Sequence, residues 1–176
     1  MKKLLLPLVF LISGCGNKSE NSLNNSLEQK QSASHIPWIY TASKDKMTDK
    51  ISRSATLFSD DKLPEIFPYE SAPVSISIYE DGDIYISSIG GHQFDCPERN
   101  GCDISIRFDG GNVKSYSAIG IDSSPPFLSI KNNNLINDIK LAKTILVQIP
   151  LFRHGHGIVK FDVTDFDPEK IRAAQP

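Results

Sequence analysis

Residues 75–87 read Ser-Ile-Ser-Ile-Tyr-Glu-Asp-Gly-Asp-Ile-Tyr-Ile-Ser. On both sides of the Asp81-Gly82 dipeptide, isoleucines occupy every second position, and serine, tyrosine or aspartate stands between and beside them. Strands with one buried face alternate in this way, and Asp-Gly is a preferred tight turn between two such strands. The stretch therefore predicts an antiparallel β-hairpin and favours a β-rich fold.

Two more hairpins are predicted further along the chain. Residues 103–108 and 113–119 flank the turn Asp109-Gly110-Gly111-Asn112, and residues 144–149 are expected to pair with 158–163 across a connection that holds residues 153–157. Nearer the N-terminus, Trp38-Ile39-Tyr40 opens a β-prone segment and residues 50–58 form another candidate strand. Strands and helices do not alternate along the sequence, which argues against a parallel α/β fold.

One segment has helical rather than strand periodicity. In residues 132–143, apolar side chains recur at helical spacing after an Asn-rich start that offers an N-cap: Leu135, Ile136, Ile139 and Ala142. We expect this helix to pack its apolar stripe on the sheet. The predicted fold is mainly β, an antiparallel curled sheet or sandwich with one packed helix at about 132–143.

The first fifteen residues have the layout of an export signal. Lys2 and Lys3 precede an apolar run over residues 4–12, and the run ends in Ser13-Gly14-Cys15. This ending resembles the lipobox of bacterial lipoproteins. The resemblance implies cleavage before Cys15 and attachment of lipid to Cys15. Because Gly16 follows instead of an aspartate, it also implies an outer-membrane destination.

An ordinary signal peptide and a single transmembrane helix are the alternatives for this segment. The apolar run over residues 4–12 is short beside the roughly 20 residues that a spanning helix needs, and it contains Pro7. The small residues before Cys15 are required only by the lipoprotein interpretation. We therefore predict a lipoprotein signal peptide over residues 1–14.

Composition suggests one tethered domain. Removal of residues 1–14 leaves 162 of the 176 residues and, with Lys2 and Lys3 lost, changes the formal net charge from -2 to -4. No basic tract indicates a nucleic-acid partner. Residues 15–35 are rich in Asn, Ser and Gln and are interpreted as a flexible tether after the lipidated cysteine. The β-rich periplasmic domain is expected over residues 36–168, with a C-terminal tail over 169–176.

Two cysteines remain when Cys15 carries lipid. Cys96 and Cys102 are separated by Pro-Glu-Arg-Asn-Gly, a sequence suited to a turn, and in an oxidising envelope we expect them to form a disulfide. A loop of this length contributes roughly 2–2.5 kcal/mol on the chain-entropy model. The pair would pin the base of the hairpin that begins at residue 102. A redox pair and half of a metal site are the alternatives.

Histidines and carboxylates supply the weaker site candidates. His154 and His156 would project to the same side of a strand and share a metal if His92 or Asp162 supplied a third ligand, although a polar, glycine-rich hairpin connection that simply tolerates histidine is the favoured explanation. Six aspartates raise the possibility of a glycosidase or calcium site, but they fall at predicted turns and strand ends. They are Asp45, Asp49, Asp60, Asp61, Asp81 and Asp83. We predict no catalytic residue, bound metal or cofactor.

Several other residues have two open interpretations. Ser123-Ser124-Pro125-Pro126 is predicted to be a rigid turn or a surface feature. One set of aromatic residues is divided between core and contact surface, with most expected in the core: Trp38, Tyr40, Phe58, Phe67 and Tyr69.

Four short motifs carry a family resemblance. They are residues 43–49 (SKDKMTD), 91–96 (GHQFDC), 102–109 (CDISIRFD) and 161–163 (FDV). Over roughly residues 38–166, their order is similar to that of uncharacterised envelope lipoproteins and, more distantly, of the type VI secretion-associated proteins VasI and TagO. The resemblance implies a role accessory to a secretion apparatus. Beyond the cysteine pair, it assigns no functional residue.

Three functions fit these features. The first is a non-enzymatic, lipid-anchored protein whose β domain binds another envelope component through a sheet edge or aromatic-bearing loops. The second is an inhibitor or immunity lipoprotein against a lysozyme-like enzyme or toxin, with residues 92–101 or 151–157 entering the partner's cleft. The third is a metal-dependent periplasmic enzyme that uses His154 and His156. We favour the first, because the sequence has neither a nucleophile elbow nor a phosphate-binding glycine loop.

Overall fold

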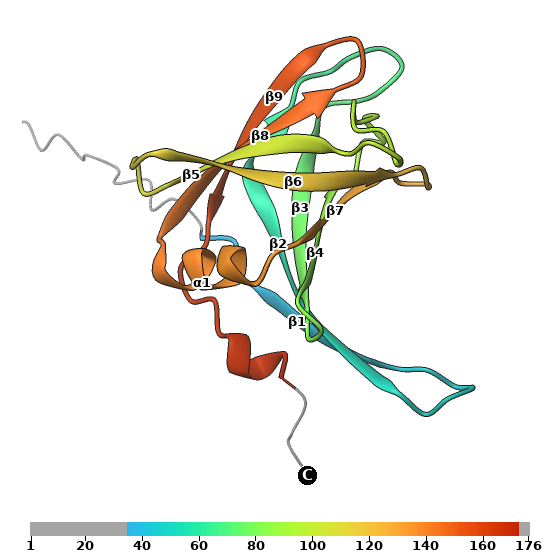
Figure 1. The fold of residues 1–176 in the computed structure, drawn as a ribbon, viewed down its shortest axis with the longest axis vertical. Coiled ribbons are helices and arrows are strands. Elements are labelled where there is room, and N and C mark those ends of the chain that lie inside the picture. The colour runs from blue at the N-terminus through green and yellow to red at the C-terminus, as the bar shows by residue number, and fades with distance from the viewer. Residues whose placement is uncertain (1–34, 173–176) are drawn as a thin grey trace, which may run out of the picture. The chain divides into compact units, whose positions relative to one another are not determined.

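A computed structural model describes residues 35–172 of the chain (Figure 1). The predicted signal peptide, Cys15, the tether up to residue 34 and the last four residues lie outside this part. The elements are β1 (Ile39–Lys44), β2 (Ile51–Leu63), β3 (Ala72–Tyr79), β4 (Asp83–Ser88), β5 (Cys102–Phe108), β6 (Val113–Ile121), β7 (Phe127–Lys131), α1 (Asn133–Leu141), β8 (Thr144–Leu151), β9 (Gly155–Asp162) and the short 3-10 helix η1 (Pro168–Lys170).

The strands form one antiparallel sheet of nine strands in the order β1-β2-β3-β4-β7-β6-β5-β8-β9. The three predicted hairpins are confirmed as β3–β4, β5–β6 and β8–β9. In the first, Gly82 takes a φ of 90° and its N–H donates to the carbonyl of Tyr79 at 3.0 Å. A residue with a side chain rarely adopts this φ, which explains why glycine follows Asp81.

Strand β7 was not predicted from the sequence. It is only five residues long, and it fills the gap between β4 and β6 in the sheet. Its buried residues Leu128 and Ile130 alternate with half-buried neighbours. This alternation, bounded by Pro126 and Asn132, is the local signal for the strand, and it is weak in so short a segment.

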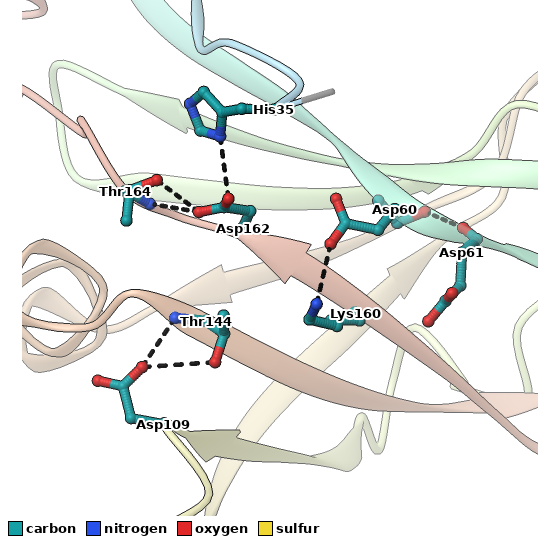
Figure 2. A network of polar contacts seen from close by, with 9 residues as sticks. His35, Asp60, Asp61, Asp109, Thr144, Lys160, Asp162 and Thr164 are labelled. Carbon is teal, nitrogen blue, oxygen red and sulfur yellow. Dashed lines mark hydrogen bonds and ion pairs between the residues drawn. The ribbon is translucent and has the colours of Figure 1, made fainter. Parts of the chain in front are cut away.

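The sheet is curled, as predicted, and remains unclosed. Figure 1 shows β5 and β6 crossing in front of the steeper strands β2, β3 and β4. The edge strand β9 turns toward the end of β2, where Lys160 Nζ lies 3.5 Å from Asp60 Oδ2 (Figure 2). At the same seam, a Cβ on Gly157 would collide with the side chain of Leu63. No backbone ladder joins β2 and β9 in residues 35–172.

The core lies inside the curl and consists mainly of branched aliphatic side chains, with a few aromatic and small ones. Strand β3 shows the pattern, since every second residue from Ala72 to Ile78 is buried while its neighbours are half-buried. Fully buried isoleucines and leucines come from strands throughout the sheet: Leu57, Ile76, Ile86, Ile104, Leu128 and Ile145. Burying each such side chain contributes roughly 1.5–3 kcal/mol, so this alternation is the main sequence determinant of the fold.

Helix α1 matches the predicted helix closely. The Asn132 side chain is its N-cap and accepts hydrogen bonds from the N–H groups of Asn134 and Leu135. Leu135 and Ile139 are fully buried, and the C-cap residue Ala142 is 8 % exposed. The Asn-rich start and the apolar spacing therefore serve the capping and packing roles expected of them.

The two ends of the described chain pack together. Trp38 contacts the ring of Phe166 with centroids 4.7 Å apart, and the Asp167 N–H donates to Tyr40 Oη at 2.7 Å. His35 Nδ1 lies 3.0 Å from Asp162 Oδ2, as Figure 2 shows. After η1, Ile171 is only 4 % exposed. Packed structure thus continues a few residues past the boundary at 168 predicted from the sequence.

The β1–β2 hairpin projects from the remainder of the sheet (Figure 1). Strand β2 extends to Leu63, beyond the candidate strand at residues 50–58. All residues from Thr41 to Ser52 are exposed. The outer edge of β1 has no strand partner within residues 35–172.

Candidate functional site

Four loops gather at one end of the sheet and form the candidate site, which we call the loop face. They connect β2 to β3 (residues 64–71), β4 to β5 (89–101), β6 to β7 (122–126) and β8 to β9 (152–154). In Figure 1 they lie toward the upper right, away from α1 and from the β3–β4 and β5–β6 turns. The loop face is defined by these four ranges.

The β4–β5 loop is fastened to the end of β8. The Phe152 N–H donates to the Gln93 carbonyl at 3.0 Å, and the Asp95 N–H donates to the Pro150 carbonyl at 3.0 Å. Phe94 also forms a β-bridge with Leu151. The structure therefore brings together the two segments, 92–101 and 151–157, that the sequence analysis selected as candidate contact loops.

A disulfide holds the other end of the β4–β5 loop. Cys96 and Cys102 are bonded, with their Cα atoms 5.0 Å apart, and Cys102 is the first residue of β5. This agrees with the predicted pinning of the β5–β6 hairpin. A Cβ on Gly120 of β6 would overlap the carbonyl oxygen of Cys96, so only glycine allows the loop to cross the sheet this closely.

His92 is a buried residue that anchors the loop face. It is 1 % exposed, and its Nδ1 and Nε2 lie 2.9 Å from Ser88 Oγ and from the Pro64 carbonyl oxygen. Since a carbonyl only accepts, the fitting arrangement has Nε2–H donating to Pro64 and the Ser88 hydroxyl donating to Nδ1. Its ring also packs on Tyr69, with centroids 5.6 Å apart. His92 thereby ties the β2–β3 loop to the β4–β5 loop.

Two neighbouring hollows open on the loop face. The smaller, of about 260 Å³, has apolar walls that include Phe94, Phe127 and Phe152. The larger, of about 660 Å³, lies between Tyr69 and the prolines of residues 122–126. Gln93, Asp122 and Pro126 line both hollows. They therefore form adjoining parts of one surface.

Three exposed apolar side chains lie on the loop face, of which Ile89 lines the larger hollow and Phe152 the smaller. Phe67, Ile89 and Phe152 are 95 %, 54 % and 44 % exposed. The guanidinium of Arg153 lies 5.0 Å from the centre of the Phe152 ring. Large apolar groups left in water at the edge of a hollow are characteristic of surfaces that another molecule covers.

The predicted histidine pair lies at the edge of the loop face, but not in the predicted geometry. His154 belongs to the β8–β9 connection, whereas His156 is in β9, and both are exposed. Gly155 between them has a φ of 69°, so the backbone is not extended and the alternation argument for a shared side does not apply.

The proposed third ligands have other partners. His92 is engaged with Ser88 and Pro64, and Asp162 accepts from Thr164 and lies beside His35 at the opposite end of β9. Six residues of strand place Asp162 roughly 20 Å from His156. Residues 35–172 contain no group of three or more His, Cys, Asp or Glu side chains arranged to hold a metal ion.

The acidic candidates are dispersed along the sheet, and most have structural partners. Asp45 Oδ1 accepts from the N–H groups of Met47 and Thr48, and these backbone bonds hold the pKa of Asp45 below its ordinary value. The remaining contacts are ion pairs of Asp49 with Lys44, Asp60 with Lys160 and Asp83 with Lys131, and a bond to Asp81 from the Asp83 N–H. Asp61 is exposed and has none of these contacts. These residues occupy strand ends and turns, as their sequence positions indicated.

The sequence analysis missed two carboxylates with clear structural roles. Asp109 accepts from the N–H group of Thr144, as Figure 2 shows, and from that of Lys143, which lowers its pKa and joins the β5–β6 turn to the start of β8. Asp138 of α1 accepts from Lys114 and Tyr116 of β6, each at 2.8 Å. Both contacts join residues far apart in the sequence, so no local pattern could reveal them.

The aromatic residues divide between core and surface. Trp38 is buried; Tyr40, Phe58 and Tyr69 are partly buried; and Phe67 is almost fully exposed. The predicted turn at residues 123–126 forms most of the β6–β7 connection and lines the larger hollow. It therefore combines the two interpretations that its sequence left open.

Comparisons with protein-family models, with curated proteins and with solved structures found no match. Among residues 35–172 there is no helix with the length and apolar character required to cross a bilayer.

Proposed function

We propose that the chain is a lipid-anchored, non-enzymatic envelope protein whose β domain binds another envelope protein through the loop face. The observation that supports this is a pair of adjoining hollows lined by the exposed side chains of Ile89 and Phe152, with the exposed Phe67 in another loop of the same loop face. Protein interfaces favour aromatic residues that fill a desolvated centre within a polar rim.

The contacts that hold the loops of the loop face suit a binding surface that is ordered before the partner binds. The Cys96–Cys102 disulfide, the buried His92 and the hydrogen bonds between residues 93–95 and 150–152 restrain the loops before any partner arrives. Loops that are already ordered lose less conformational entropy on binding. Anchoring at Cys15 and a partner within a secretion apparatus remain predictions from the lipobox and from the family resemblance.

Site-specific photo-cross-linking in intact cells tests the binding surface. A photoreactive phenylalanine would replace Phe67 or Phe152 on the loop face. The controls are Val113, which begins β6 after the β5–β6 turn, and Leu141, which ends α1; they are 61 % and 82 % exposed and belong to elements outside the loop face. We expect a discrete protein adduct from the two loop-face positions alone. Equal adducts from the control positions, or none from the loop face, would refute the proposal.

The anchor has a separate test. We expect Cys15→Ser to move the protein from the membrane fraction to the soluble periplasm and to abolish the loop-face adduct if the partner is membrane-bound. Retention of the Cys15→Ser variant in membranes would contradict lipid attachment at Cys15. Wild-type chain expressed at the same level is the reference.

An inhibitor of a lysozyme-like enzyme is the second candidate. It is favoured by the joining of residues 92–101 to residues 151–157, because two braced loops side by side can enter a partner's cleft as one unit. The purified domain should then slow peptidoglycan lysis, and Phe152→Ala should weaken this effect. Unchanged lysis with several classes of lysozyme would eliminate the inhibitor function.

A further inference from the structure

The loop face carries an excess of negative charge. Its four loops contain five carboxylates (Glu65, Glu70, Asp95, Glu98 and Asp122) and two guanidinium groups (Arg99 and Arg153). All five acidic residues are exposed. With histidine neutral, the loop face has a formal charge of -3, although it is a small part of a chain whose total is -2.

These carboxylates also differ from the others in their surroundings. Within residues 35–172, none of the five accepts a side-chain hydrogen bond or lies in an ion pair. Elsewhere, eight carboxylates lie within 4 Å of a basic nitrogen: Asp49, Asp60, Glu80, Asp83, Asp138, Asp162, Asp165 and Glu169. The loop-face carboxylates do not have a comparable structural role within the domain.

Two of the five free carboxylates line the hollows. Glu98 and Asp122 line the smaller hollow together with Phe94, Phe127 and Phe152, and Asp122 also lines the larger one. Unpaired charge beside exposed apolar surface resembles one half of an interface, in which an apolar centre is bordered by charges that the partner complements. The aromatic hollow and the acidic rim are independent features of the same surface.

We infer that the partner of the loop face is a cationic protein, a proposal that rests on the binding function proposed above. An apolar side chain of the partner occupies the hollow between Phe94, Phe127 and Phe152. Lysine or arginine side chains around it meet Glu98 and Asp122. Such complementarity raises the association rate and selects against acidic partners, and salt screens it because the charges are exposed.

The decisive experiment combines the Phe152 photo-cross-linker with charge-neutralising variants in intact cells. Glu98→Gln/Asp122→Asn removes two rim charges while keeping side-chain shape. The matched control is Asp81→Asn/Glu169→Gln, which removes two exposed carboxylates outside the loop face, in the β3–β4 turn and in η1. The asparagine keeps an acceptor for the Asp83 N–H, and the second change breaks only the exposed ion pair with Arg172. We expect the adduct to fall about fivefold or more in the loop-face variant and to stay unchanged in the control.

A charge-retaining variant guards against an effect on folding. Glu98→Asp/Asp122→Glu should restore most of the adduct, and circular dichroism melting should give all three double variants the thermal midpoint of the wild type. An adduct that survives neutralisation of Glu98 and Asp122, or that identifies an acidic partner, would overturn the cationic assignment while leaving loop-face binding intact. Absence of any adduct from Phe152 would instead refute the binding function itself.

Synthetic peptides provide the measurement in solution. The probes are a peptide that alternates lysine with tryptophan and leucine, and its counterpart with glutamate in place of lysine. In amide NMR spectra of the full domain, we expect the cationic peptide to shift Gln93 and Phe152, with weaker binding as salt rises. Equal binding of the acidic peptide, or shifts away from the loop face, would contradict the inference.

Discussion

Asp109 shows how an exposed carboxylate can serve the fold. Its Oδ1 accepts from the N–H groups of Thr144 at 2.8 Å and Lys143 at 2.9 Å, and these bonds, that of Thr144 first, lower the pKa of Asp109. A carboxyl whose folded pKa is depressed stabilises the protein above its unfolded pKa of about 3.9. That stabilisation is lost as the pH falls through the folded pKa.

We therefore expect Asp109→Asn to lower the thermal midpoint near neutral pH, with the difference from wild type shrinking as the pH falls from about 6 to about 3. The asparagine keeps an acceptor oxygen but cannot carry the charge. Melting curves across this pH range provide the measurement, and Asp61→Asn, at an exposed residue without these contacts, is the control. If the thermal midpoint of Asp109→Asn stayed below that of the wild type by the same amount at every pH, the charge of Asp109 would not be the source of the stabilisation.

His92 supports the loop face through the contacts of its two ring nitrogens and through the packing of its ring on Tyr69. His92→Ala leaves the buried Ser88 hydroxyl without its partner, frees the Pro64 carbonyl and opens a cavity beside Tyr69. Each unpaired buried group costs about 1–3 kcal/mol, so we expect a loss of about 3 kcal/mol in the free energy of unfolding, measured with urea. His154→Ala, at an exposed position, should leave stability nearly unchanged. Similar losses in both variants would refute the anchoring role of His92.

At the level of elements, the crossing of the β4–β5 loop over β6 requires Gly120. A methyl group there would overlap the Cys96 carbonyl, so Gly120→Ala must move the loop or the strand. We expect a loss of about 2–3 kcal/mol in urea denaturation. Gly110→Ala tests backbone strain without overlap, because Gly110 has a φ of 73° and no atom lies within 4 Å of the place that its Cβ would take. We expect Gly110→Ala to lower the free energy of unfolding by about 1 kcal/mol. A larger loss in Gly110→Ala than in Gly120→Ala would contradict the steric explanation.

The elements that could be predicted are those with local determinants. The β3–β4 hairpin follows from alternation around Asp81-Gly82, and α1 follows from the Asn132 cap and the spacing of Leu135 and Ile139. Strand β7 escaped prediction because five residues after a proline pair give a weak periodic signal. Its insertion between β4 and β6 depends on pairing between distant segments, which sequence periodicity does not encode.

The candidate site was predictable only in pieces. Residues 92–101 and 151–157 were identified as contact loops, but the bonds that join them connect Gln93 to Phe152 and Asp95 to Pro150 across more than 50 residues. The paired histidines were the stronger chemical signal in the sequence, yet the positive φ of Gly155 invalidates the geometry assumed for them. The unpaired state of the loop-face carboxylates is likewise a property of the folded surface alone.

At the scale of the whole molecule, contact between the ends of the domain is a stability determinant. Phe166 is 8 % exposed and packs on Trp38, the single tryptophan of the chain. We expect Phe166→Ala to reduce the free energy of unfolding by about 3 kcal/mol and to red-shift Trp38 fluorescence in the folded state, because water reaches the indole. Phe152→Ala on the loop face should change neither. Unchanged emission in Phe166→Ala would show that this ring does not shield Trp38.

The same contact affects when the domain is able to fold. His35 pairs with Asp162, and Tyr40 with residues 165–167, across sequence separations of 125 to 127 residues. Translation proceeds from the N-terminus, so Phe166, which covers Trp38, emerges long after it. A nascent chain that lacks Phe166 retains an incomplete core, and closing so long a loop slows folding. Under the export proposed above, this delay would keep the polypeptide unfolded until residues 165–167 have passed through the translocation pore.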